Sequence, residues 1–321
     1  MEATKPVQQA FGSPGGKSYL APRIAAIIPP HKTYVEPFAG AAAVYFRKEP
    51  SQKEILSDKD SEIAFAFRFL RDMTPEQLEG LKRYKWVKHK AIYDRLKASK
   101  PKNDVERFYR FYYLRRASFG KGGGSFSTYD EGESVDMERV MARLWRVHGR
   151  LQGTKVHSTD ATSLISKYDS PDTFFYLDPP YPNRAFIGQT FKDWTEKDLQ
   201  QLIGKLKGIK GKFALSLGTE HTKFIPKGWH VNRVKVWRRI PSGDGEFNQT
   251  YQYEIIATNY NPTKQPRVEF TPAKLPEAKM RLRNQRREPA RMVRPGIAYT
   301  DGKGQRLSRR SHRHWRRVAF A

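Results

Sequence analysis

In FFYLDPPYPN, residues 174–183, an acid, two prolines and a tyrosine come directly after an apolar run. A short apolar run rich in aromatic residues is typical of a buried strand. Pro179 and Pro180 each restrict the residue before them to extended conformations, so the peptide does not continue as a helix. Asp178 therefore stands at the carboxyl end of a buried strand, where open α/β sheets bind their ligands.

The bend after this strand predicts two neighbouring hydrogen-bond acceptors. The carboxylate of Asp178 and the backbone carbonyl of Pro179 together suit an amino group, which has two hydrogens to donate. Tyr181 adds an aromatic face on which a planar base can stack. A strand-ending turn with a surface aspartate is the alternative. We predict that Asp178, Pro179, Pro180 and Tyr181 form the reactive part of a site.

The surrounding sequence predicts a doubly wound α/β fold with a Rossmann-like sheet. Apolar segments typical of buried parallel strands occur at residues 33–38, 53–57, 154–158, 173–177 and 212–217. Amphipathic stretches lie between several of them, and Thr195 is placed to cap one such helix. Residues 230–240 and 251–260 alternate polar and apolar side chains, which predicts antiparallel strands at an edge of the sheet.

Two regions depart from this pattern. Residues 74–149 show helical patterns and a glycine-rich loop, which predicts a helical insert between the second and third strands. From Pro262 onward there are 17 Lys or Arg against 4 Asp or Glu, with few apolar residues to form a core. We expect residues 262–321 to be a mostly disordered basic arm that binds phosphates without reading base sequence; a solubilising tail is the alternative.

The composition points to a nucleic acid as partner. Of the 321 residues, 60 are Lys or Arg and 33 are Asp or Glu, a formal net charge of +27. Such a surplus favours DNA or RNA, whereas a membrane partner lacks support because no apolar run approaches the ~20 residues that span a bilayer. With no cysteine and no paired metal-ligating histidines, we expect neither a disulfide nor a metal site. The start of the chain lacks the pattern of a signal peptide, so an intracellular protein is expected.

A first turn suited to a nucleoside follows the first predicted strand, in YVEPFAGAAAVYF (residues 34–46). Gly40 allows the backbone to approach a ligand closely. Asp58, at the end of the next strand, is placed to accept both hydroxyls of a ribose. The G-x-G-x-x-G pattern of pyrophosphate sites is missing, so a cofactor with adenosine but no pyrophosphate fits better. We therefore predict S-adenosylmethionine.

DPPY after an apolar strand, with EPFAG upstream and SPGGKS near the start, resembles the Dam-type DNA adenine methyltransferases. The similarity extends through nearly all of residues 11–260, and includes FYYLRRASFG before the glycine-rich loop, HSTDA before the fourth strand and RRIPSGDG before the last strand. It implies transfer of a methyl group from S-adenosylmethionine to the amino group of an adenine flipped out of double-stranded DNA. It also implies a cofactor-binding part (1–73), a recognition insert (74–149), a catalytic part (150–261) and the basic arm (262–321).

The resemblance assigns roles to individual residues. Lys17 would approach the methionine end of the cofactor, and Asp160 its adenine. Asp178 and Tyr181 would hold the target adenine. The cofactor-binding residues implied are Ser13, Lys17, Glu36, Phe38, Gly40, Asp58, Asp160 and Asp178. The DNA-contacting residues implied are Arg115, Arg116, Lys121, Ser125, Arg238 and Arg239.

The chain departs from this family pattern in places. Ser13 stands where the family usually has an aromatic residue, and Ala42 replaces a common glycine. The loop GKGGGSFSTYDEGES has few base-reading side chains, so we expect loose sequence specificity. Methylation of cytosine N4, methylation of adenine in RNA, and a non-catalytic DNA-binding protein with a decayed fold are the alternatives. We expect a monomer in a prokaryotic or phage-infected cytoplasm, at the nucleoid, with a cognate restriction endonuclease as a candidate partner.

Overall fold

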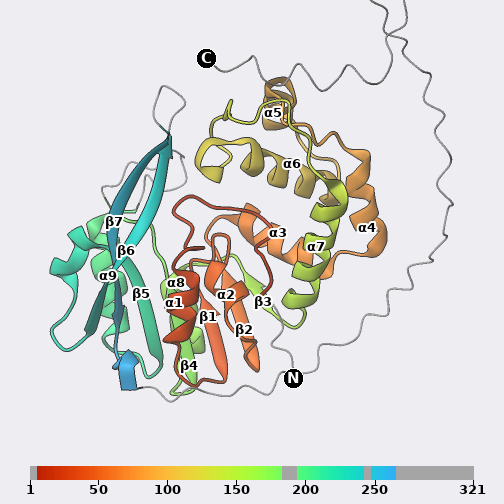
Figure 1. Ribbon diagram of the computed structural model, residues 1–321. Helices are drawn as coiled ribbons and strands as arrows, with labels where there is room; N and C mark the ends of the chain where they lie inside the picture. Colours follow the sequence, from red (N-terminus) through yellow and green to blue (C-terminus); the bar gives the residue numbers. More distant parts are fainter. Residues whose placement is uncertain (1–5, 183–193, 242–246, 265–321) are drawn as a thin grey trace, which may run out of the picture. The chain divides into compact units, whose positions relative to one another are not determined.

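A computed structural model describes residues 6–182, 194–241 and 247–264 (Figure 1). Its centre is a seven-stranded sheet with the order β3-β2-β1-β4-β5-β7-β6. The strands from β1 to β5 pair in parallel, and β7 runs antiparallel to both of its neighbours. The strands are β1 (Thr33–Glu36), β2 (Lys53–Ser57), β3 (Lys155–His157), β4 (Thr173–Leu177), β5 (Lys212–Gly218), β6 (His230–Pro241) and β7 (Phe247–Thr258). The predicted doubly wound fold and its antiparallel edge are confirmed.

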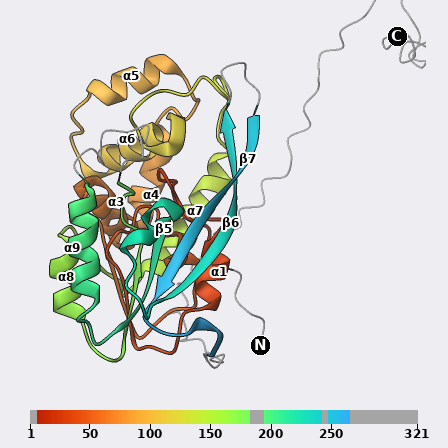
Figure 2. The same ribbon diagram turned by 90° about the vertical axis from the view of Figure 1, so that its left-hand side faces the viewer.

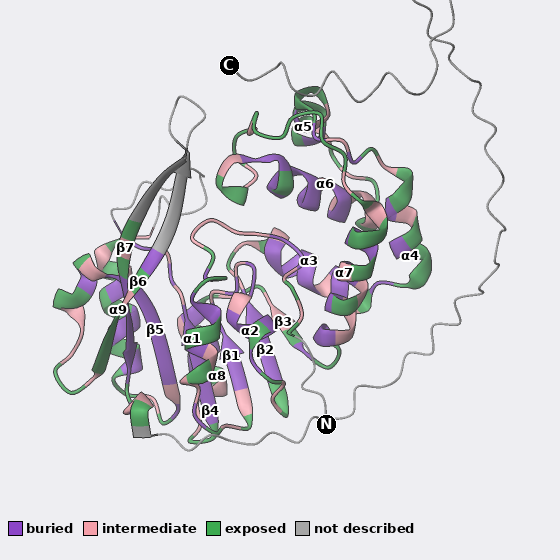
Figure 3. Cartoon of the chain, in the orientation of Figure 1, coloured by how far each residue is buried: buried purple, intermediate pink, exposed green. Residues whose placement is uncertain are grey.

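Helices cover both faces of this sheet. On one face lie α1 (Ala21–Ala26), α2 (Ala43–Arg47) and α3 (Ser61–Asp72), and on the other α8 (Ala161–Tyr168) and α9 (Glu196–Leu206), as Figure 2 shows. Side chains alternate between the faces of a strand, and β4 feeds both cores in this way. Phe174 and Tyr176 pack with the first group of helices, whereas Phe175 and Leu177 pack with the second. Figure 3 shows the central strands as the buried layer.

One strand and one cap test the sequence reasoning directly. Segment 154–158 was predicted to be a buried strand, but β3 is an edge strand, in which Lys155 is exposed and Val156 and His157 are half-buried. Among the described strands, β3 pairs with β2 only. Thr195 does cap α9: its hydroxyl accepts a hydrogen bond from the backbone N–H of Asp198, and the side chain of Asp198 accepts one in return from the N–H of Thr195.

The chain between β2 and β3 is largely helical after α3. It forms α4 (Pro75–Gly80), η1 (Leu81–Arg83), α5 (Lys90–Ala98), α6 (Asp104–Ala117), η2 (Phe119–Lys121) and α7 (Met137–Leu151). Apolar residues of α6 and α7, among them Phe108 and Leu144, belong to the same core as Tyr34 of β1. These helices therefore share one core with the sheet, and α7 runs across the boundary predicted at residue 149. Their role as a recognition insert stays a prediction.

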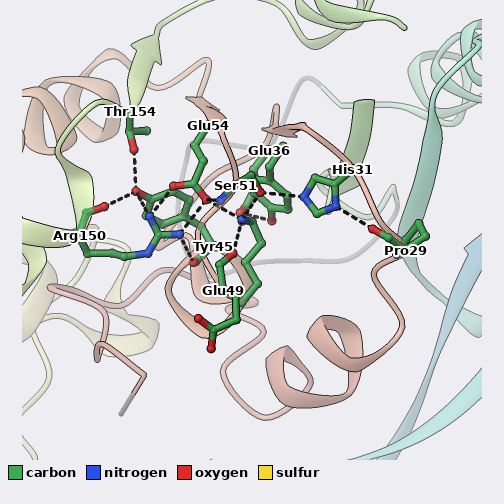
Figure 4. A network of polar contacts seen from close by, with 11 residues as sticks. Pro29, His31, Glu36, Tyr45, Glu49, Ser51, Glu54, Arg150 and Thr154 are labelled. Carbon is green, nitrogen blue, oxygen red and sulfur yellow. Dashed lines mark hydrogen bonds and ion pairs between the residues drawn. The ribbon is translucent and has the colours of Figure 1, made fainter. Parts of the chain in front are cut away.

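A buried ionic network ties α7 to the sheet (Figure 4). The guanidinium of Arg150 forms a bidentate ion pair with Glu54 of β2 and donates a 2.7 Å hydrogen bond to the hydroxyl of Tyr45 in α2. Lys48 pairs with the same carboxylate, and all three charged side chains are nearly inaccessible to water. The network locks α2, β2 and α7 together at the amino end of β2.

The last part of the chain contributes little to the described structure. Its described end is η5 (Pro262–Lys264), and the rest of the arm predicted for residues 262–321 lies outside the described residues.

Within the residues that the structure describes, every helix is too short or too polar to cross a membrane.

Candidate active site

A cavity of about 520 Å³ lies at the carboxyl ends of β1, β2 and β4. This volume falls within the range of roughly 300–1,000 Å³ that is usual for small-molecule sites. The lining includes every residue predicted for catalysis or cofactor binding: Ser13, Lys17, Glu36, Phe38, Gly40, Asp58, Asp160, Asp178, Pro179, Pro180 and Tyr181. The structure thus brings together side chains from positions up to 168 residues apart in the sequence.

The turn after β1 brings backbone close to the cavity. Gly40 has φ +48°, a left-handed conformation in which a Cβ would lie 2.9 Å from the hydroxyl of Ser13. Ala42 has φ +53°, also left-handed, where a side chain costs roughly 1–2 kcal/mol. Glycine adopts this conformation without that cost, so Ala42 is a strained residue in the turn.

Lys17 and Asp178 form the central ion pair of the cavity. The ammonium nitrogen of Lys17 lies 2.7 Å from Oδ1 and 2.9 Å from Oδ2 of Asp178, and it also donates to the carbonyl of Gly15 at 3.0 Å. The same nitrogen lies 4.9 Å from the centre of the Tyr181 ring, within the range of a cation–π contact. Lys17 thus contacts the DPPY motif directly, a role that sequence reasoning did not assign to it.

Glu254 of β7 completes this group, and sequence reasoning missed it. Its side chain is fully buried, it accepts a 3.2 Å hydrogen bond from the hydroxyl of Tyr181, and it lies 3.8 Å from the nitrogen of Lys17. An acid inside an apolar strand, YQYEIIAT, is the signal that could have found it, because a buried carboxylate is costly unless it is paired.

A third acid near Asp178 is neutral at pH 7. Burial raises the pKa of Glu36 to about 8. The 2.7 Å hydrogen bond that the hydroxyl of Tyr34 donates to Glu36 lowers this pKa, but by less. The negative charge of Asp178 also raises this pKa. Glu36 therefore lies next to Asp178 as an uncharged hydrogen-bonding group.

Asp58 supports the first turn as well as lining the cavity. Its two carboxylate oxygens accept hydrogen bonds from the backbone N–H groups of Gly40, at 2.8 Å, and Asp60, at 2.9 Å. Burial raises the pKa of Asp58 to about 6, so the group is mostly ionised at neutral pH. Each carboxylate oxygen has a second lone pair, so a ligand hydroxyl can still be accepted.

Two aromatic side chains and an N-cap form the remaining wall. Phe38 and Trp194 meet edge to face, with ring centres 5.6 Å apart. The indole N–H of Trp194 is buried and lacks a hydrogen-bond partner within the described residues. Asp160 caps α8 through Oδ1, which accepts from the backbone N–H groups of Thr162 and Ser163. The orphaned indole N–H and the unfilled space beside it are features of a ligand site.

The residues predicted to contact DNA fall into three groups. Arg116, Lys121 and Ser125 are exposed and lie outside the cavity lining. Arg238 and Arg239 lie in β6, and their side chains are outside the described part of the structure.

Arg115 differs from the prediction of a DNA contact. Its side chain is nearly inaccessible to water and donates a 3.1 Å hydrogen bond to Asp60, the N-cap of α3. It also lines the cavity, which a surface DNA contact would not. The guanidinium is engaged in holding α6 against the start of α3, because a buried charge needs a paired counter-charge.

The fold and the site together define a doubly wound α/β protein with an acid-rich cavity at the carboxyl edge of its sheet. Residues 13–239 match the family model described as "D12 class N6 adenine-specific DNA methyltransferase", and the chain belongs to this family. It is 24% identical to the Type II methyltransferase M.CviBI of Paramecium bursaria Chlorella virus NC1A over 259 residues, which cover 77% of this chain and 97% of the viral protein. It is also 24% identical to the Type II methyltransferase M1.LlaDCHI of Lactococcus lactis subsp. cremoris over 270 residues, 77% of this chain and 93% of that protein.

Proposed function

We propose that the protein transfers a methyl group from S-adenosylmethionine to the N6 amino group of an adenine flipped out of double-stranded DNA. The observation that carries this proposal is the position of Asp178 and Tyr181, which line the cavity directly after β4 in a chain of the N6-adenine DNA methyltransferase family. DNA methylation follows from the family, and the donor, the flipped base and the residue roles are our inference.

The charges of the cavity favour a cationic donor. Although the chain carries a net charge of +27, acids outnumber bases in the lining. The acids are Glu36, Asp58, Asp60, Asp160, Asp178 and Asp198, and the bases are Lys17, Lys59 and Arg115. When bound, S-adenosylmethionine supplies a methyl group attached to a positively charged sulfur. This sulfur becomes a neutral thioether when the methyl group is transferred. Asp58, the Phe38–Trp194 wall and Asp160 would hold the nucleoside part.

The residues after β4 would prepare the target amine. Its lone pair is delocalised into the purine ring, which makes the nitrogen a weak nucleophile. If Asp178 and the Pro179 carbonyl accept the two N–H groups, the lone pair turns out of the ring plane toward the donor. A new N–C bond then forms, and one of the two amino protons leaves toward the carboxylate of Asp178. Stacking on Tyr181 would hold the ring, so positioning and electrostatics supply most of the rate.

The base must leave the helix to reach this cavity. The amino nitrogen of a paired adenine is hydrogen-bonded inside the duplex, and flipping costs a few kcal/mol. Exposed basic residues such as Arg116 and Lys121 would offset this cost by binding phosphates.

Both curated relatives are Type II methyltransferases, so we also propose that this protein has a partner, a restriction endonuclease that recognises the same DNA site.

The test is methyl transfer by an Asp178→Ala variant. We expect a loss of about 10³-fold in kcat because the amine loses its charged acceptor, with cofactor affinity within about 5-fold of the wild type. Tritiated S-adenosylmethionine and unmethylated genomic DNA measure the rate, and mass spectrometry of the digested DNA distinguishes N6-methyladenine from N4-methylcytosine.

Asp172→Ala is the matched control, since Asp172 lies at the surface before β4 and pairs with exposed Lys32. It should keep wild-type activity. Full activity of Asp178→Ala, or N4-methylcytosine as the product, would contradict the proposal.

A further inference from the structure

Lys17 already uses the acceptor atoms that a target amine needs. Its nitrogen lies within 2.9 Å of both carboxylate oxygens of Asp178. Lys17 is also nearly inaccessible to water, at 6% exposure, so its charge cannot simply be left without a partner. An adenine amine that binds Asp178 competes with Lys17 for these oxygens, and a Lys17 that gives way needs another acceptor.

We propose that Glu254 is this acceptor: Lys17 shifts from Asp178 to Glu254 when the target base enters, and Glu254 thereby acts as a positioning residue. The proposal rests on the function proposed above. Oε2 of Glu254 lies 3.8 Å from the Lys17 nitrogen, so a movement of about 1 Å gives a normal hydrogen bond of 2.7–2.9 Å. The ammonium group has three hydrogens and can keep its 3.0 Å bond to the Gly15 carbonyl during the shift.

The position of Glu254 supports a role beyond packing. It is fully buried in β7, opposite Gly218 of β5, and residues 255–258 after it are also buried. A carboxylate costs several kcal/mol in such surroundings unless it is paired, whereas an apolar residue would continue the strand without that cost. Glu254 faces the DPPY motif, and the hydroxyl of Tyr181 donates to it at 3.2 Å, compared with 3.5 Å to Asp178.

This arrangement keeps the charges of the site balanced in both states. Before the base enters, Lys17 neutralises Asp178, and Glu254 accepts the hydrogen bond from Tyr181. After it enters, Asp178 faces the amine and Lys17 neutralises Glu254. The hydrogen bond to Glu254 also fixes the Tyr181 ring, against which the base would stack.

The test compares Glu254→Gln and Glu254→Ala with the wild type. Glutamine keeps an acceptor for Tyr181 but removes the charge that would receive Lys17. We expect both variants to lose about 10- to 100-fold in kcat, equivalent to about 1.4–2.7 kcal/mol. The KM for unmethylated genomic DNA and the calorimetric Kd for S-adenosylhomocysteine should stay within about 3-fold. A kcat for Glu254→Gln within 2-fold of the wild type would overturn the proposal.

Glu79→Gln is the matched control, because Glu79 also pairs with a lysine, Lys82, but at the surface. It should leave all three constants unchanged. Melting temperatures of all variants show whether the fold is kept, and Glu254→Gln supplies the answer should Glu254→Ala fail to fold.

A double-mutant cycle separates action through Lys17 from a general structural effect. If Glu254 works by receiving Lys17, then Glu254→Gln should not slow a Lys17→Ala enzyme further. Independent, multiplying losses would overturn the proposal. A wild-type enzyme without any methyl transfer would instead contradict the proposed function itself, so the two failures are distinguishable.

Discussion

The chemistry of the site depends on three acids that the protein treats differently. Asp178 is ion-paired with Lys17, Glu254 is hydrogen-bonded to Tyr181, and Glu36 is kept neutral by burial, with a pKa of about 8. Three ionised carboxylates around one ammonium group would repel each other strongly in these surroundings. The neutral form of Glu36 therefore limits the negative charge around Lys17.

This neutral acid makes stability depend on pH. The pKa of Glu36 is about 8 in the folded protein, against an ordinary value of 4.5, so between these values the folded protein holds a proton that the unfolded chain has lost. Its contribution to the free energy of unfolding is present below pH 4.5 and is lost as the pH rises to 8, by at most about 1.4 kcal/mol per pH unit. Denaturant unfolding at pH 5 to 8 measures this.

Glu36→Gln is the comparison for that measurement, since an amide does not titrate. The wild type should lose stability relative to Glu36→Gln as the pH rises from 5 to 8. Parallel curves for the two proteins would show that Glu36 is already ionised in the folded state.

At the scale of elements, the buried pair Glu54–Arg150 joins β2 to α7 (Figure 4). This contact fixes the last helix before β3 against the strand whose end carries Asp58. The hydrogen bonds from Arg150 to Glu54 and Tyr45 satisfy donors that would otherwise be buried without partners. The position of β2, which ends next to Asp58 in the cavity lining, is thus tied to an ionic contact at the start of the strand.

Removing one partner should therefore be costly. We expect Glu54→Ala to lower the free energy of unfolding by about 3–5 kcal/mol, because Arg150 and Lys48 would remain buried without a counter-charge. Asp172→Ala, which breaks an exposed pair with Lys32, should cost about 0–1 kcal/mol. Equal losses in urea unfolding would contradict this assignment.

The same ion pair predicts that the folded protein loses stability at low pH. Although burial alone would raise the pKa of Glu54, its hydrogen bonds and ion pairs with Arg150 and Lys48 hold it below 4.5. Its stabilising contribution is therefore present above pH 4.5 and is lost as the pH falls through the lowered pKa.

At the scale of the whole molecule, the charge of the cavity differs from that of the chain. Acids outnumber bases in the cavity lining, while the 60 Lys or Arg residues of the chain include 17 after residue 261. This difference fits the two proposed ligands, a cationic small molecule and a polyanionic nucleic acid.

Deleting residues 262–321 should test the contribution of the arm. We expect weaker DNA binding and a flatter dependence of affinity on salt, because fewer counterions are released from the DNA. Sequence preference should not change. Fluorescence anisotropy over a salt series on two unrelated duplexes measures both effects, and an unchanged slope would contradict the arm's role.

Local motifs explain how far the site could be predicted. Asp178, Gly40 and Asp58 were identifiable because each directly follows a strand, and the carboxyl ends of neighbouring parallel strands meet at one edge. Glu254 and Trp194 were not, because their roles arise from contacts with residues far away in the sequence. The burial of Arg115 was not predicted, because its position on a helix was known but the direction of its side chain was not.

The amino-acid sequence alone determined the class of sheet, because strand periodicity acts locally, and its motifs pointed to the family through their resemblance to known methyltransferases. Only the tertiary structure decided which charges meet inside the cavity. Burial and long-range pairing set the ionisation of Glu36, the engagement of Arg115 and the contact of Glu254 with Lys17. These depend on distances between side chains that local sequence patterns do not encode.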